Sequence, residues 1–230
     1  RLGNRLLLSK AMQKLDSTIL IHGLWDAREE AKYIASTIRR RSNERRRALI
    51  SALSDIDDDV VQSPMEKEFQ DLTDVVIMAR TSMKLHLIKE ALTNAGVPFV
   101  TTDNATRMKE EEDTLSWLSQ KRSKDVETLP MKPVIVATMH RSKGEEYDDV
   151  YLAGWTEGEF PHPDAVSSNR VHEERRLAYV ALTRARQRVV ITHSFMTRVL
   201  HYGKDGRKRY VTGQVEPSRF LYELVPSKRI

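Results

Sequence analysis

Two segments of the sequence concentrate side chains that could contact phosphate groups. The first, residues 138–146, directly follows an apolar run that predicts a strand at 134–138. In open α/β sheets, ligands bind outside the carboxyl ends of the strands. We therefore expect a binding site at this strand end, and Gly144 would allow the chain a sharp turn there. The residues of this segment that could take part are Thr138, His140, Lys143, Gly144 and Glu146.

The second segment, residues 173–186, predicts a helix that ends in arginines. Glu173 and Glu174 open it and arginines close it, which is the arrangement that the helix dipole favours. Its apolar side chains would hold it to a sheet and leave Arg184 pointing past the sheet edge, where it could reach a phosphate supplied by another domain. A guanidinium suits that role because it is always charged and can stabilise the charge that spreads in phosphoryl transfer. The simpler interpretation is an amphipathic helix with a charged, exposed face.

The elements that must position these segments alternate between strand and helix patterns, which predicts an α/β domain with a mainly parallel sheet. Asp26 with Glu29 forms a capping box at one helix start, Ser82 is expected to cap another helix, and Gly96 to end it. The tail from residue 194 is basic and mixed, and its stretch 217–224 should dock onto the body. Strands are expected at 18–22, 74–79, 97–100, 134–138, 150–153 and 188–192, and helices at 1–15, 26–38, 65–72, 82–95, 105–122 and 171–185.

The composition fits a globular protein with an anionic partner. Hydrophobic residues make up 40% of the 230 residues, and no run approaches the roughly 18 apolar residues of a membrane helix. Cysteine is absent, which excludes a disulfide scaffold and a thiolate zinc site and fits an intracellular protein. The net charge of +5 favours nucleic acid as a partner. The basic and acidic blocks within 39–70 predict a solvated helix and loop, and a nucleic-acid contact by the arginines of 39–47 is the less favoured interpretation.

Taken together, the two segments resemble motifs V and VI of the UvrD/Rep/PcrA-type helicases of superfamily 1. The first reads T-M-H-R-S-K-G-E-E-Y from Thr138, and the second reads E-E-R-R-L-A-Y-V-A-L-T-R-A from Glu173. Weaker similarities are R-T-S at 80–82, G-E-F-P at 158–161 and P-S-R-F at 217–220. The resemblance is strong over 134–193 and extends over nearly the whole chain.

The resemblance implies a RecA-like P-loop NTPase fold: the second motor domain of an ATP-dependent DNA helicase that moves 3′ to 5′ on single-stranded DNA. Arg184 would contact the γ-phosphate of ATP, and Glu146 and Gly144 would lie at the nucleotide, with Glu146 bonding the ribose. Thr138, His140, Arg80 and Ser82 would contact the DNA backbone. Lys143 could approach a phosphate or form a salt bridge, and Arg175 could be a structural partner within the cleft. Trp155 and Phe160 are expected in the core rather than stacked on a base.

Several family features are missing from the sequence. It has no G-x-x-x-x-G-K-[ST] phosphate loop and no strand ending in paired acids, so Mg²⁺ and most ATP contacts are expected from a first motor domain. This chain would then be inactive alone, as one domain over 1–230. Only residues 123–132 stand where many members insert a large accessory subdomain, and Glu145 replaces an apolar residue of the family pattern.

Three rival interpretations remain open at the level of sequence. The Upf1-like branch of superfamily 1 moves in the opposite direction and also ends its sixth motif in V-A-L-T-R-A. A helicase subunit of a recombination nuclease would carry similar motifs. A non-catalytic nucleic-acid-binding module could have kept the fold, although the intact Arg184 and Glu146 argue against that.

Overall fold

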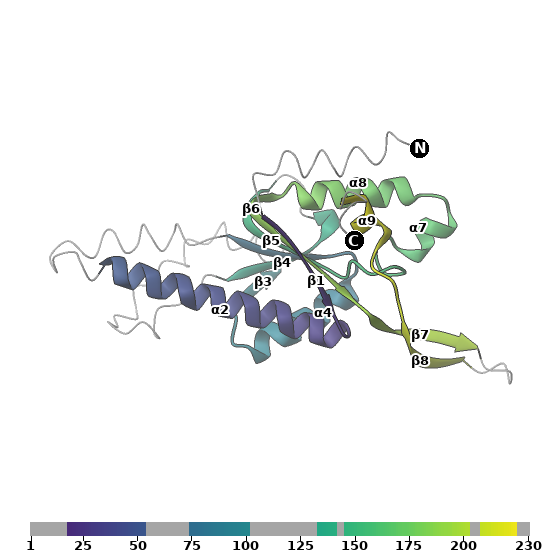
Figure 1. Cartoon of the computed structure of the whole chain (residues 1–230), viewed down its shortest axis with the longest axis horizontal. Helices are drawn as coiled ribbons and strands as arrows, with labels where there is room; N and C mark the ends of the chain where they lie inside the picture. Colours follow the sequence, from purple (N-terminus) through teal and green to yellow (C-terminus); the bar gives the residue numbers. More distant parts are fainter. Residues whose placement is uncertain (1–17, 54–73, 102–132, 142–144, 203–207, 225–230) are drawn as a thin grey trace.

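The computed structural model describes residues 18–53, 74–101, 133–141, 145–202 and 208–224. Its centre is a six-stranded sheet in the order β1-β6-β5-β2-β4-β3, in which every neighbouring pair is parallel. Two antiparallel strands, β7 and β8, form a separate ribbon that extends away from this sheet (Figure 1). The predicted α/β class with a mainly parallel sheet flanked by helices is confirmed.

The strands are β1 (Thr18–Leu24), β2 (Val75–Ala79), β3 (Phe99–Thr101), β4 (Val134–Thr138), β5 (Tyr147–Ala153), β6 (Ala185–Ser194), β7 (Met196–Tyr202) and β8 (Lys208–Gln214). The helices are α2 (Ala27–Leu53), α4 (Ser82–Asn94), α7 (Pro163–Ser167), α8 (Val171–Leu182) and α9 (Arg219–Leu224), with a 3₁₀ turn, η3, at Met139–Arg141.

Helices cover both faces of the sheet, so its central strands are buried on both sides. Alternate residues of β2 show this, because Val76 and Met78 join the core under α8 and α9, while Ile77 and Ala79 join the core under α2 and α4 (Figure 1). Strands buried on both faces read as continuous apolar runs, which is why 74–79 and 150–153 stand out in the sequence.

The predicted helix boundaries hold in part. Asp26 Oδ1 accepts hydrogen bonds from the N–H groups of Arg28 and Glu29, at 2.9 and 2.8 Å, so it caps α2 as predicted. The predicted cap at Ser82 is wrong: Thr81 is the N-cap of α4, and its hydroxyl accepts from the Lys84 N–H. Ser82 is instead the first helical residue. Thr81 has an extended backbone, which places its own hydroxyl where it can accept from an N–H of the first helical turn.

Several elements differ in length from the prediction; α2 in particular runs on to Leu53, into the segment that was expected to be a solvated helix and loop. β5 begins at Tyr147 and β6 at Ala185, each three residues before the expected start, and α8 ends at Leu182 rather than at 185. The Tyr147 N–H donates to the carbonyl of Arg184, so pairing between the two strands starts in residues too polar to read as strand. The helices expected at 1–15, 65–72 and 105–122, and the link at 123–132, lie outside the described residues.

The C-terminal segment docks onto the α8 face, as expected. Phe220 is fully buried, and its ring lies edge-on to Phe160, with ring centroids 5.2 Å apart. Trp155 packs edge-on against Phe160 and is also fully buried, which confirms the prediction that these two aromatic residues belong to the core. The hairpin of β7 and β8 had no counterpart in the sequence prediction.

Candidate nucleotide and nucleic-acid sites

Four of the predicted DNA-contacting residues gather at the carboxyl edge of two paired strands. Ala79 of β2 pairs with Thr138, the last residue of β4, so Arg80 and Ser82 follow one strand where Thr138 and His140 follow its neighbour. His140 is exposed in the 3₁₀ turn, and Ser82 is exposed at the start of α4. The sequence patterns thus identified four polar residues whose closeness depends on parallel pairing.

A pocket of about 670 Å³ opens at this edge, between the 3₁₀ turn and the helices α7 and α8. Charged and polar side chains of both signs line it: three arginines (Arg80, Arg170, Arg176), three carboxylates (Asp164, Glu173, Glu174) and two histidines (His140, His162). Burial, and then the nearby Arg80 guanidinium, lower the pKa of His140 below its usual range, so this imidazole is neutral at physiological pH.

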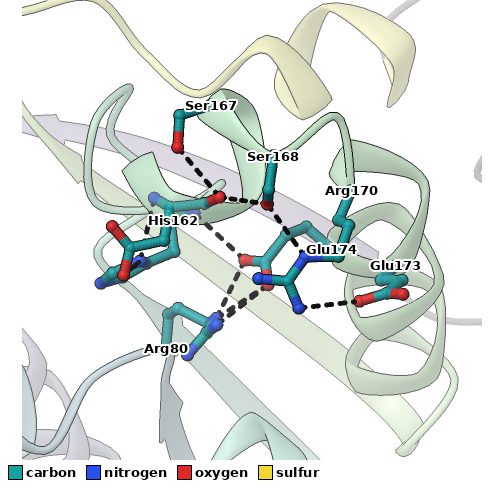
Figure 2. Close-up of polar contacts among 8 residues, drawn as sticks. Arg80, His162, Ser167, Ser168, Arg170, Glu173 and Glu174 are labelled. Carbon is teal, nitrogen blue, oxygen red and sulfur yellow. Dashed lines mark hydrogen bonds and ion pairs between the residues drawn. The ribbon is translucent and has the colours of Figure 1, made fainter.

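Arg80 is fixed by a bidentate ion pair with Glu174 of α8 (Figure 2). Its Nε lies 2.9 Å from Oε2 and its Nη2 lies 3.0 Å from Oε1. Oε2 also accepts a hydrogen bond from the His162 N–H at 3.1 Å, so both carboxylate oxygens are engaged. Burial acts to raise the pKa of Glu174, but the bonds from Arg80 and the His162 N–H lower it overall, so the carboxylate is ionised. Glu174 was expected only to cap and orient its helix.

Glu146 does not lie at the carboxyl edge, so that prediction of its position is wrong. It precedes β5, whose residue Asp149 pairs with Val75 at the start of β2, which puts Glu146 at the amino edge of the sheet. The physical reason is that β4 and β5 both pair in parallel with β2, so the end of β4 and the start of β5 lie at opposite edges of the sheet. Its carboxylate is 62% exposed and lies 3.8 Å from Arg186 Nε. Lys143 and Gly144 lie outside the described residues.

Arg184 lies at this same amino edge, immediately before β6. Its side chain does not point past the edge as predicted. Nε donates to the carbonyl of Val180 at 3.1 Å, and Nη1 donates to the carbonyl of Glu145 at 3.3 Å. The arginine therefore folds back over the last turn of α8, because carbonyls without a partner in the helix attract a cation. The guanidinium is only partly buried, so a stronger anionic acceptor could still draw it away.

Glu145, which departs from the family pattern, has a local partner. Its carboxylate accepts a hydrogen bond from the Tyr147 hydroxyl at 2.5 Å. Burial, and then this bond to Glu145, raise the pKa of the Tyr147 hydroxyl well above its usual range. The effect of this glutamate is therefore local to the amino edge, where Glu145 accepts the hydrogen bond of a buried tyrosine.

Arg175 holds the C-terminal helix to α8. Its Nε and Nη2 lie 2.8 and 2.9 Å from the carboxylate oxygens of Glu223, and its guanidinium lies over the Phe220 ring. These contacts occupy the arginine with α9, consistent with the predicted structural role.

Two charged clusters escaped the sequence analysis. Glu30 of α2 is fully buried and accepts from Lys84 Nζ at 2.7 Å, from Thr192 Oγ1 at 2.6 Å and from the Gly154 N–H at 2.8 Å. Lys84 also contacts Glu159 at 3.0 Å. A signal existed, since Glu30 precedes Ile34 and Ile38 at four-residue spacing, which puts a charge in the apolar stripe of the helix.

The second cluster explains part of the arginine run in 39–47. Asp149, almost fully buried, accepts from Arg188 at 2.8 Å and Arg45 at 3.1 Å, with Arg41 at 3.6 Å. Arg41 and Arg45 therefore pack on the sheet, and the solvated-helix interpretation holds only for neighbours such as the exposed Arg40.

Comparison with known proteins identifies the domain. A model of the UvrD-like helicase C-terminal domain matches residues 108–195, the stretch that contains both segments. Residues 108–195 belong to a UvrD-like helicase C-terminal domain. Rep, an ATP-dependent DNA helicase, from Escherichia coli is 42% identical over 91 residues, which is 40% of this chain and 12% of that protein. DNA helicase II of Haemophilus influenzae is 34% identical over 136 residues, which is 59% of this chain and 18% of that protein.

The aligned part of this chain thus spans less than a fifth of either helicase. Among solved structures, the C-terminal domain of a possible DNA helicase from Lactobacillus plantarum aligns with a TM-score of 0.42 and 10% identity, over 83% of this chain and 84% of that one.

Among the described residues, no group of three or more His, Cys, Asp or Glu side chains is arranged to hold a metal ion. None of the helices in the described ranges is long and apolar enough to cross a membrane.

Proposed function

We propose that this chain is the C-terminal motor domain of an ATP-dependent DNA helicase that translocates 3′ to 5′ on single-stranded DNA. In this proposal, Arg184 contacts the γ-phosphate of ATP and Glu146 its ribose, while Thr138, His140, Arg80 and Ser82 contact the DNA backbone. A first motor domain would hold Mg²⁺ and most of the nucleotide, so this chain by itself would neither hydrolyse ATP nor unwind DNA.

The observation that carries the proposal is the separation of the two residue sets to opposite edges of one sheet. Arg184 and Glu146 lie at the amino edge, where their side chains are partly or largely exposed, while Arg80 and His140 line the pocket at the carboxyl edge. A motor needs separate sites for nucleotide and track, joined so that the state of one biases the other.

Two connections join these edges. Only six positions along the chain separate His140 at one edge from Glu146 at the other, and α8 runs from Glu174, which holds Arg80, to the turn that carries Arg184. Closure of a cleft on ATP at one edge would therefore move the DNA contacts at the other with it. Such closure uses the differential affinity of the nucleotide for two domain arrangements.

The contacts of Arg184 at the amino edge are compatible with binding to the phosphates of a nucleoside triphosphate. The contacts that hold Arg184 are neutral acceptors: two carbonyls at 3.1 and 3.3 Å and the Thr183 hydroxyl at 3.4 Å. A charged phosphate oxygen makes a bond about twice as strong. ATP can thus displace the resting contacts, and Arg184 would then stabilise the charge that develops on the transferred phosphoryl group.

The test is Arg184→Ala in the full-length protein. We expect DNA-stimulated hydrolysis to fall by about 10³–10⁵, the range for arginines in this role. The substitution should also abolish the preference for an ATP analogue over ADP in equilibrium binding. The control is Arg40→Ala, which removes an exposed arginine whose one ion pair within the described residues is with Glu44, and it should leave both measurements unchanged. Hydrolysis that survives Arg184→Ala would refute the role of this residue.

Polarity needs its own measurement. The full-length protein should unwind duplexes with a 3′ single-stranded tail. A strict preference for 5′ tails would refute the proposed direction and favour the Upf1-like branch.

A further inference from the structure

Glu174 presents an apparent electrostatic contradiction. It is an acidic side chain lining a pocket where the proposed function puts the phosphates of DNA. A carboxylate at that place should repel the ligand. Its contacts, however, engage both oxygens with positive or hydrogen-bonding groups from other elements (Figure 2).

The geometry of the ion pair selects which donors of Arg80 remain available. Glu174 takes Nε and Nη2, whereas Nη1 makes no hydrogen bond to any residue in the described ranges. The Arg80 side chain is 21% exposed and lines the same pocket as His140. An arginine held on one side by a carboxylate loses less conformational entropy when its other side meets a phosphate.

Glu174 is itself held firmly. Its side chain is 6% exposed, and the His162 N–H and the two Arg80 nitrogens hold it in place at distances of 2.9 to 3.1 Å. Its neighbour Glu173 differs, because its side chain is 56% exposed and its ion pair, with Arg170, is a loose one of 3.8 Å. Of two adjacent glutamates at the start of one helix, Glu174 is thus buried and firmly bonded, whereas Glu173 is exposed and loosely paired.

We propose that Glu174 is a positioning residue for DNA binding: it holds the Arg80 fork so that Nη1 is presented to a backbone phosphate in the pocket beside His140. The inference rests on the proposed function, because it requires single-stranded DNA at this edge. It adds a residue that touches no DNA and yet sets the affinity through Arg80.

The proposal makes a prediction opposite in sign to simple electrostatics. Glu174→Gln removes a negative charge from the pocket, so a residue that merely repels DNA would give tighter binding when replaced. A positioning residue gives weaker binding, by about tenfold, the size of one charge-assisted hydrogen bond. The plot of log K against log salt has a negative slope, and this slope should become shallower by about 0.7, because one phosphate contact on a single strand is lost.

The experiment measures equilibrium binding of a labelled oligothymidylate to the full-length protein over a series of salt concentrations. Glu90→Gln is the control: it makes the same charge change at an exposed residue of α4 that does not line the pocket, and it should bind as well as the unmodified protein. In an Arg80→Gln background, Glu174→Gln should cause no further loss, since its effect acts through Arg80. Additive losses from the two substitutions would overturn the proposal, as would unchanged or tighter binding by Glu174→Gln.

A second variant tests the idea if Glu174→Gln does not fold. Arg80→Lys keeps the charge but cannot form the fork, so it should lose affinity by a similar factor, and binding equal to that of the unmodified protein would overturn the proposal. The two hypotheses fail differently. Unmodified protein that does not bind single-stranded DNA contradicts the proposed function, whereas normal binding with insensitivity to both substitutions contradicts only the role of Glu174.

Discussion

Removal of the Lys84 ammonium should destabilise the protein strongly and make its stability depend on pH. In Lys84→Met, the fully buried Glu30 loses its cation at 2.7 Å and keeps only neutral donors, from Gly154, Thr192 and Ser194. Glu159 loses its contact at 3.0 Å at the same time. Breaking a buried ion pair from one side costs about 3–5 kcal/mol, because an uncompensated charge stays in the interior.

The pH dependence follows from the direction of the pKa shifts. Burial acts to raise the pKa of Glu30, but Lys84 and the hydrogen bonds lower it overall. In the unmodified protein, Glu30 therefore stabilises the fold at pH values above its ordinary pKa of 4.5, and this stabilisation is lost on acidification. Burial acts to lower the pKa of Lys84, but Glu30 and Glu159 raise it, so the contribution of Lys84 is present below 10.5 and is lost as pH rises through the folded value. Between these limits the pair is fully stabilising.

In Lys84→Met the direction reverses for Glu30, because burial then raises its pKa above 4.5. The folded state binds the extra proton, so the variant loses stability as pH rises from 4.5 to the new folded pKa. The difference in unfolding free energy between the variant and the unmodified protein should therefore grow by about 1.4 kcal/mol for each pH unit in that window.

Urea unfolding at pH 5 and pH 8 provides the assay. Lys89→Met is the control: Lys89 belongs to the same helix, and it makes no ion pair within the described residues, so a loss under about 1 kcal/mol is expected. If Lys84→Met were as mild as this control, or equally destabilising at both pH values, the argument from a buried pair would be refuted.

Two further predictions concern the core and the carboxyl-edge pocket. Phe220→Ala should lower the unfolding free energy by about 3–5 kcal/mol in urea titration, because the ring is fully buried between Phe160 and Arg175, whereas Tyr222→Ala, at a position 49% exposed on the same helix, should change it little. The His140 imidazole should titrate below pH 6.5 by NMR, and Arg80→Gln should raise its pKa by removing a nearby positive charge; a titration above 6.5 in the unmodified protein would contradict this.

The sequence by itself determined the fold class, the core aromatics and the location of the two segments that resemble helicase motifs. Local patterns suffice for these, because strands buried on both faces are continuous apolar runs and a capped helix announces its first turn. The run R-R-L-A-Y-V-A-L-T-R-A predicts, from local sequence alone, a helix with an arginine at its end. Asp26 and the α9 residues that dock in the core were predictable for the same local reasons.

Only the tertiary structure decided which residues share an edge and which partners they have. His140 and Glu146 are six positions apart in the sequence, yet the parallel order of β4, β2 and β5 separates them to opposite edges of the sheet. Arg80 and Glu174 are 94 positions apart and form one bidentate pair. Hydrogen bonds and ion pairs between distant segments produce no periodic sequence pattern from which they could be predicted. The geometry of the pocket, and the role that we assign to Glu174 within it, therefore follow from the packing of α8 against the ends of the strands.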